Sequence, residues 1–192
     1  NHRLGEAVVA APTARLADDP QTPLRILEIG AGTGGTTAML LPLLEPYRQH
    51  IAEYAYTDIS KAFLFQAEEH FVPAYPYVAP RLFDVELPLA GQGMASGHYD
   101  LVIATNVLHA TRNIRNTLSN LKATLRTGRL LLLNEISTKS LFAHLTFGLL
   151  EGWWLSEEQV LRFSDAQVRA PEAGREGLRQ EGISRGPPPL PQ

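Results

Sequence analysis

Hydrophobic residues along this chain form two kinds of pattern: short apolar runs, and longer stretches with apolar residues three or four positions apart. Short runs are typical of buried strands, and the longer stretches are typical of helices with one apolar face. The runs predict strands at residues 25–29, in the second half of 51–58, and at 81–85, 99–105 and 130–136. The periodic stretches predict helices at residues 35–44, 60–71 and 113–125.

This alternation of strands with helices indicates the class of fold. Parallel strands joined through helices need right-handed crossovers, and the helices then cover both faces of the sheet. The apolar run within residues 99–105 is typical of a strand that is buried on both faces. The sequence therefore predicts an α/β fold with a mostly parallel sheet and helices on both faces.

Both ends of the chain depart from this pattern. Residues 1–23 carry three prolines among small and charged residues, and we expect a helix fragment followed by a linker there. The core is predicted at residues 24–164. Residues 165–192 are rich in proline and glycine and contain no convincing strand, a composition that is typical of a disordered tail.

Composition and charge exclude several classes of function. The 44% apolar and 19% charged residues are ordinary for a globular protein, and a net charge of -3 offers no basic field for nucleic acid. Without cysteine there is no disulfide, thiolate metal site or cysteine nucleophile. No apolar stretch approaches the ~20 residues that span a bilayer, and the N-terminus shows no secretion signal. We expect a cytoplasmic protein without a metal, nucleic-acid or membrane partner.

A glycine-rich turn follows the first predicted strand. It reads Glu-Ile-Gly-Ala-Gly-Thr-Gly-Gly over residues 28–35 and leads into a predicted helix. Glycine permits backbone angles that a Cβ would forbid, and the first amides of the helix can face a ligand held at the turn. Because Gly30, Gly32 and Gly35 also satisfy G-x-G-x-x-G, the glycines indicate a nucleotide-like cofactor without deciding which one.

Polar residues follow the other predicted strands at their carboxyl ends, where ligands of such sheets bind. Asp58 can accept hydrogen bonds from both hydroxyls of a ribose, which NAD and S-adenosylmethionine share. Asp84 can accept a hydrogen bond from an adenine amino group. Asn106 can donate to a substrate carbonyl or bind the amino-acid end of the cofactor. Together these residues predict a site along one edge of the sheet.

A histidine and a glutamate follow the last two predicted strands, which are neighbours in this fold. His109 lies just past residues 99–105, and Glu135 lies at the end of the next strand. A carboxylate on one imidazole nitrogen fixes the tautomer and leaves the other nitrogen free to accept a proton. The pair is therefore a candidate general base that needs no metal.

Four stretches of sequence together resemble the C-methyltransferase domain of modular polyketide synthases. They lie at residues 28–37, 54–60, 99–111 and 145–154, within a match over roughly 24–155. The resemblance implies a Rossmann-like class I methyltransferase that uses S-adenosylmethionine. Its implied substrate is a β-ketoacyl chain, methylated at the α-carbon while it is carried on the phosphopantetheine arm of an acyl carrier protein. Neighbouring synthase domains are further implied partners.

The resemblance also implies roles for individual residues. It makes His109 the base and Glu135 the residue that orients it. The candidate cofactor-binding residues, from the glycine turn and the strand ends, are Glu28, Gly30, Ala31, Gly32, Gly34, Asp58, Ile59, Asp84 and Asn106. The family has a helical lobe before this core and an antiparallel strand pair after it. We expect neither here, and we interpret the chain as the truncated core of a multidomain synthase.

Three other functions remain open on these residues. An O- or N-methyltransferase would keep the same cofactor and could use the same histidine and glutamate as a base. An NAD-dependent oxidoreductase shares the glycine turn and Asp58, although the sequence contains no Tyr-x-x-x-Lys pair. A binding module would keep the cofactor pocket without turning over a substrate.

Overall fold

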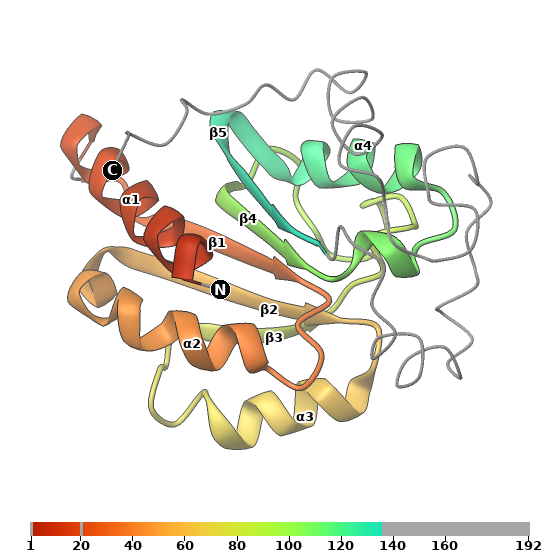
Figure 1. Ribbon diagram of the computed structural model, residues 1–192, viewed down its shortest axis with the longest axis horizontal. Coiled ribbons are helices and arrows are strands. Elements are labelled where there is room, and N and C mark those ends of the chain that lie inside the picture. The colour runs from red at the N-terminus through yellow and green to blue at the C-terminus, as the bar shows by residue number, and fades with distance from the viewer. Residues whose placement is uncertain (1, 20, 136–192) are drawn as a thin grey trace.

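The structure is a computed structural model that describes residues 2–19 and 21–135 of the chain (Figure 1). Within them, five strands form one sheet in the order β3-β2-β1-β4-β5, and each neighbouring pair is parallel. The strands are β1 (Leu24–Ile29), β2 (Ile51–Asp58), β3 (Val78–Leu82), β4 (Tyr99–Thr105) and β5 (Leu125–Asn134). The helices are α1 (His2–Asp18), α2 (Gly35–Leu44), η1 (Glu45–His50), α3 (Lys61–His70), η2 (Leu108–Ala110) and α4 (Ile114–Thr124).

Helices cover both faces of the sheet, which confirms the predicted fold class. α1, α2 and α3 lie on one face, and α4 lies on the other (Figure 1). Leu101 and Ile103 of β4 pack beneath the first three helices, whereas Val102 and Ala104 pack beneath α4. All four side chains are completely buried, so the prediction that this strand is buried on both faces is also confirmed.

The third strand lies three residues earlier in the chain than predicted. β3 spans Val78–Leu82 rather than 81–85, and it lies at an edge of the described sheet. Pro80, in its middle, pairs with Tyr56 of β2. Proline has no N–H to donate and is tolerated in a sheet mainly on edge strands, where the missing donor can face away from the neighbour. The predicted bounds are wrong because this proline makes an edge strand resemble a loop.

The fifth strand begins earlier than predicted. β5 starts at Leu125, directly after α4, although Leu125 is predicted to belong to the helix. Its pairing with β4 shifts register between Leu125, opposite Tyr99, and Leu130, opposite Leu101. Gly128 lies within this irregular stretch with a φ of 73°, which glycine adopts easily. Beyond the shift, residues 130–134 form the strand that the apolar run predicts.

Asp100, near the amino end of β4, joins α1 to the sheet. Its Oδ1 lies 3.2 Å from Nη1 of Arg126, 3.4 Å from Nε of Arg129 and 3.6 Å from Nε of Arg15. Its Oδ2 accepts a hydrogen bond of 3.0 Å from the backbone N–H of Arg25. Because the side chain of Asp100 is 1% exposed and that of Arg15 is 5% exposed, this cluster is largely shielded from water.

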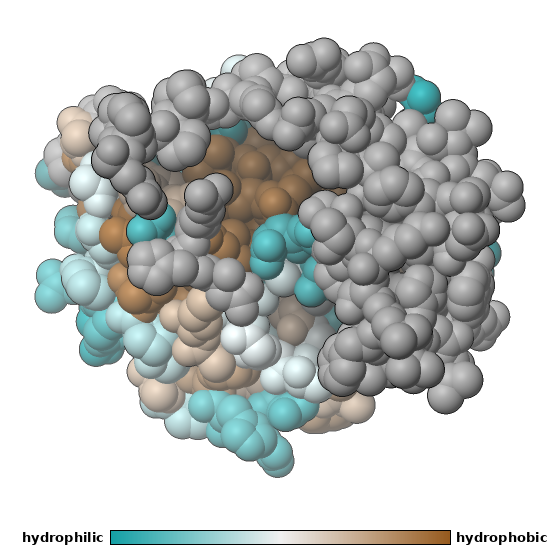
Figure 2. Space-filling view, viewed as in Figure 1, coloured by the Kyte–Doolittle hydropathy of each residue, from teal (hydrophilic) through white to brown (hydrophobic). Residues whose placement is uncertain are grey.

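On the face drawn in Figure 2, described apolar residues show in the region where Figure 1 places α1 and β5. Residues 130–133 of β5 are half-buried, whereas residues 99–104 of β4 are buried. The sheet is therefore more exposed at β5 than at its centre. None of the described helices has the length and hydropathy of a membrane span.

Candidate cofactor site and active site

The site is expected where the strand order reverses at the carboxyl edge of the sheet. β1 lies between β2 and β4, so the chain moves outward in one direction from β1 to β3 and then returns to β1's other side at β4. The turn after β1 leads to α2 on one face, and the turn after β4 leads towards α4 on the other (Figure 1). Such an arrangement opens a crevice between the two turns.

The glycines of the first turn serve different purposes. Gly30, Gly32 and Gly34 have φ angles of 59°, 59° and 80°, in the left-handed region that favours glycine. A Cβ on Gly30 would lie 2.7 Å from Cγ2 of Val107, and one on Gly34 would lie 2.5 Å from Cε2 of Phe71. A Cβ on Gly32 would meet no described atom within 4 Å. The protein's own packing requires Gly30 and Gly34, while Gly32 faces open space that a ligand can enter.

β2 holds this turn through three consecutive residues. The backbone N–H of Ala31 donates to the carbonyl of Thr57 at 2.9 Å. The N–H of Gly32 donates to Oδ2 of Asp58 at 2.9 Å, and the hydroxyl of Tyr56 donates to the carbonyl of Gly32. Both polar backbone groups of Gly32 are therefore bound by side chains from the same strand.

Asp58 is a largely buried carboxylate at the edge of the turn. It is 7% exposed, and its Oδ1 accepts a hydrogen bond of 2.8 Å from the N–H of Ser60. Each carboxylate oxygen has two lone pairs, so both oxygens of Asp58 keep acceptor capacity after binding a backbone amide. Next to it, the apolar side chain of Ile59 is 69% exposed. An acceptor and an exposed apolar side chain thus lie beside the open space at Gly32.

Glu28 lies inside the protein rather than on the surface of the turn. Its side chain is 1% exposed, and its Oε2 accepts hydrogen bonds of 2.6 Å from the hydroxyls of Thr37 and Tyr54. Burial raises the pKa of Glu28 to about 7, against the opposing effect of these two hydrogen bonds. Its contacts join β1 to β2 and α2, so they support the turn from behind. A direct contact with a cofactor remains a prediction for this residue.

Asp84 lies two residues beyond β3, in a loop that Gln92 organises. The backbone N–H of Asp84 donates to Oε1 of Gln92 at 2.8 Å, and its carbonyl accepts from Nε2 of Gln92 at 3.0 Å. Oδ1 of Asp84 accepts from the N–H of Glu86 at 2.9 Å. Gln92 therefore fixes the backbone of Asp84, which is predicted to bind adenine. Nothing in the sequence around Gln92 indicates this role.

The turn after β4 is tied to the end of β5. Asn106 has a φ of 55°, and its N–H donates to the carbonyl of Asn134 at 2.8 Å. The N–H groups of Val107 and Leu108 both donate to Oε1 of Glu135 at 2.8 Å. The carboxylate of Glu135 thus accepts hydrogen bonds at the start of η2, where backbone donors lack partners within the helix.

His109 is the second residue of η2, and its side chain lies outside the part of the chain that the structure describes. The structure brings the backbone turn that carries His109 next to the carboxylate of Glu135, through Val107 and Leu108. The same turn packs against the glycine turn. The side chain of Val107 lies so close to Gly30 that a Cβ on Gly30 would be 2.7 Å from Cγ2 of Val107.

Comparison with known proteins agrees with this geometry. The model of a family described as "Methyltransferase domain" matches residues 27–131, which is more than half of the chain. The chain belongs to the methyltransferase domain family.

Relatives of this methyltransferase domain include polyketide synthase PksM of Bacillus subtilis (strain 168). The two are 49% identical over 95% of this chain and 4% of that synthase, so the chain spans a small fraction of its relative. The crystal structure of DszA carbon methyltransferase matches with a TM-score of 0.85 and 36% identity, over 94% of this chain and 47% of that one. The trans-methyltransferase CalH, solved in complex with SAH, matches with a TM-score of 0.77 and 34% identity, over 93% of this chain and 52% of that one.

These matches confirm the resemblance to C-methyltransferase domains of polyketide synthases and S-adenosylmethionine as the cofactor. The described residues of the methyltransferase domain fit that group. Gly32 leaves open space, the carboxylate of Asp58 beside it suits a ribose diol, and the exposed Ile59 suits an apolar ring face. Tyr56 is the contact to the turn that sequence reasoning missed, because a tyrosine in an apolar strand resembles any core aromatic residue.

Proposed function

We propose that this domain acts within a cytoplasmic multidomain synthase and methylates the α-carbon of a β-ketoacyl chain on an acyl carrier protein. His109 is the general base, and Glu135 positions and supports it. Similarity to polyketide synthases and to carbon methyltransferases supports this class of substrate. The proposal depends chiefly on one observation. Glu135 accepts two backbone hydrogen bonds from the turn that carries His109, and that turn packs against the glycine turn after β1.

The residues divide the work between two turns. Asp58, whose carboxylate binds the N–H of Gly32, would hold the ribose hydroxyls, and the left-handed turn at Gly32 would admit the adenosyl group. S-adenosylmethionine, when bound, supplies a methyl group on a positively charged sulfur as the electrophile. On the other turn, the imidazole of His109 takes a proton from the α-carbon of the substrate. This carbon is acidified by two carbonyl groups, so one side-chain base suffices.

Glu135 contributes through position and charge. Its hydrogen bonds to Val107 and Leu108 hold η2 at the end of the neighbouring strand, which fixes the backbone of His109. A carboxylate close to an imidazole also stabilises the imidazolium that forms when the base takes its proton. Holding the base and the acceptor carbon next to the glycine turn provides the proximity that speeds a bimolecular transfer.

The test compares His109→Ala with the parent chain on a β-ketoacyl carrier protein. Loss of a general base is expected to lower kcat by about 10²–10⁴-fold. The affinity for SAH, measured by calorimetry, is expected to stay at the parental value, because no cofactor contact is removed. His98→Ala is the matched control and should leave kcat unchanged. His98 directly precedes β4, at the amino end of the strands, and its Nε2 lies 3.9 Å from Oε2 of Glu53.

Two variants at the glutamate separate its roles. Glu135→Gln keeps an oxygen that can accept from Val107 and Leu108 but removes the charge, whereas Glu135→Ala removes both. We expect kcat to fall in the order parent, Gln, Ala. A His109→Ala chain that methylates carbon at the parental rate would show that the base is elsewhere. If product analysis finds the methyl group on oxygen, the proposal that carbon is the acceptor is wrong.

A further inference from the structure

We propose that Tyr56 is a positioning residue for cofactor binding: its hydroxyl holds the carbonyl of Gly32 and so keeps the glycine turn in the shape that receives the adenosyl group. The inference rests on the proposed function, because it assumes that the turn binds S-adenosylmethionine. It assigns to Tyr56 an effect on cofactor affinity and none on the chemical step.

The hydrogen bonds around Gly32 carry the argument. Tyr56 and Asp58 are two residues apart on β2, so their side chains lie on the same face of the sheet. Tyr56 binds the carbonyl of Gly32, and Asp58 binds its N–H. Glycine has more conformational freedom than any other residue. These two bonds restrict it at Gly32, the one of the three positive-φ glycines in this turn whose Cβ position meets no described atom within 4 Å.

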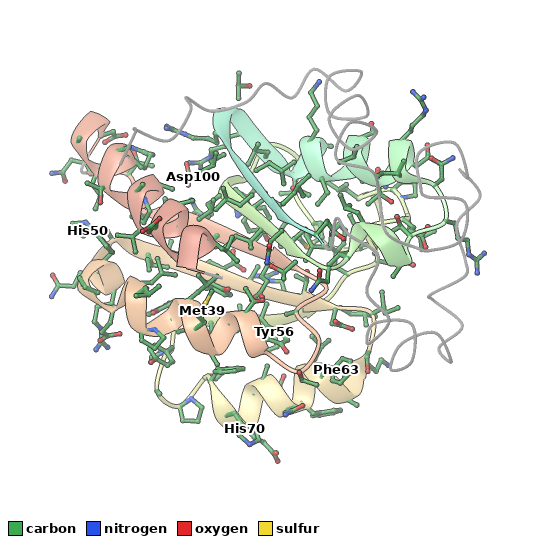
Figure 3. The ribbon with its side chains drawn as sticks, viewed as in Figure 1. Met39, His50, Tyr56, Phe63, His70 and Asp100 are labelled. Carbon is green, nitrogen blue, oxygen red and sulfur yellow. The ribbon has the colours of Figure 1, made fainter. Side chains whose placement is uncertain are left out.

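The ring of Tyr56 is itself held in place. It packs against Phe71 with ring centroids 6.1 Å apart, and it is almost completely buried. A Cβ on Gly34 would lie 2.5 Å from Phe71 and 3.6 Å from the hydroxyl of Tyr56, so this aromatic pair forms the floor beneath the turn. Figure 3 shows Tyr56 near the connection between β1 and α2. The hydroxyl therefore reaches the turn from a rigid support.

The hydroxyl is also kept in its donating form. Burial, together with the negative charges of Glu28 and Asp58, raises the pKa of Tyr56 above its ordinary value. The phenol thus remains protonated at neutral pH and can donate to Gly32.

Two nearby tyrosines show that this role belongs to Tyr56. The hydroxyl of Tyr54, on the same face of β2, donates to Glu28 at 2.6 Å. The hydroxyl of Tyr77 is buried and has no hydrogen-bond partner among the described residues. Tyr77→Phe is therefore a matched control, because it removes the same atom in the same core without breaking a hydrogen bond.

The experiment measures SAH binding to the full chain by calorimetry for the parent, Tyr56→Phe and Tyr77→Phe. Loss of one hydrogen bond predicts a Kd about two- to twelve-fold higher for Tyr56→Phe. Tyr77→Phe should bind as the parent does. In turnover assays, Tyr56→Phe should raise the KM for S-adenosylmethionine while kcat and the KM for the acyl carrier protein remain at parental values. A purely structural loss would not produce this split.

The failures of the two proposals are distinguishable. A parent chain that does not bind SAH refutes the proposed function. A parent that binds, with Tyr56→Phe binding equally well, overturns the role of Tyr56. Should Tyr56→Phe not fold, Phe71→Leu keeps the hydroxyl but removes the ring that supports it. That variant is expected to weaken SAH binding, and parental affinity in it would overturn the inference.

Discussion

Carboxylates lie at both ends of the parallel sheet, but they bind different partners. At the carboxyl end, Asp58, Asp84 and Glu135 accept hydrogen bonds from backbone N–H groups of the loops. At the amino end, Asp100 and Glu53 face arginine side chains, and Asp100 also accepts one backbone N–H, that of Arg25. A backbone amide fixes a loop without neutralising the carboxylate, whereas an arginine cancels its charge. The comparison teaches that carboxylate side chains shape a binding site at one end of the sheet and stabilise the fold at the other.

Asp100→Ala is expected to have the largest effect of the changes that test this contrast. It would leave the guanidinium groups of Arg15, Arg126 and Arg129 close together without the buried carboxylate between them. Removing one partner of a buried pair costs about 3–5 kcal/mol of unfolding free energy. Urea denaturation measures the loss, and the SAH affinity of the folded fraction should not change.

The control for this change is an exposed ion pair. Glu45 and Arg48 lie 2.9 Å apart with side chains 43% and 54% exposed, and Glu45→Ala should cost at most about 1 kcal/mol. If Asp100→Ala costs no more than Glu45→Ala, the amino end does not stabilise the fold in the way the contrast requires.

The buried centre of the fold could be predicted from the sequence more closely than its edges. β4 has the predicted bounds because a strand buried on both faces leaves an apolar run that no loop imitates. β3 is displaced because an edge strand accepts Pro80, and β5 starts early because Leu125 follows α4 without a turn residue between them. Local patterns report burial well, and they report pairing at an edge poorly.

The same limit applies to the site. Asp58, Asn106 and Glu135 lie at or just beyond strand ends, as predicted, because topology alone brings carboxyl ends to one edge. Their partners could not be predicted, since the amides that Asp58 and Glu135 bind depend on the shape of the loops. Gln92 was missed for this reason: its four hydrogen bonds to loop backbone arise only after the chain has folded.

Glu28→Gln is expected to have an intermediate effect that depends on pH. The pKa of Glu28 is raised from 4.5 to about 7 in the folded chain, so between these values the folded state holds a proton that the unfolded state has released. The stability that this proton contributes is complete below 4.5 and is lost as the pH rises through about 7. The parent should lose up to about 1 kcal/mol per pH unit across this window from Glu28 alone.

Glutamine removes that dependence because it cannot ionise, while its carbonyl can still accept from Thr37 and Tyr54. Urea denaturation from about pH 5 to about pH 8 should show Glu28→Gln gaining stability relative to the parent, by about 2 kcal/mol in all. A difference between the two chains that stays constant over this range would mean that Glu28 ionises at its ordinary pKa. It would then resemble the exposed carboxylates rather than a buried support of the turn.

Asp58→Asn is expected to have the smallest effect, and it tests the opposite end from Asp100. Asparagine has one acceptor oxygen, so it can serve either Gly32 or Ser60 but not both, and its NH₂ group then faces a backbone N–H. We expect a Kd for SAH about tenfold higher, which equals about 1.4 kcal/mol, and a smaller loss of unfolding free energy. Asp19→Asn is the matched control, because Oδ1 of Asp19 accepts from the N–H groups of Gln21 and Thr22 just before β1, away from the cofactor site, and asparagine can keep both bonds. If Asp58→Asn costs as much stability as Asp100→Ala and leaves the SAH affinity unchanged, carboxylates at the two ends do the same work. If affinity falls while the fold holds, the carboxyl end is organised around its ligand, since the amides that Asp58 binds belong to the turn that admits it.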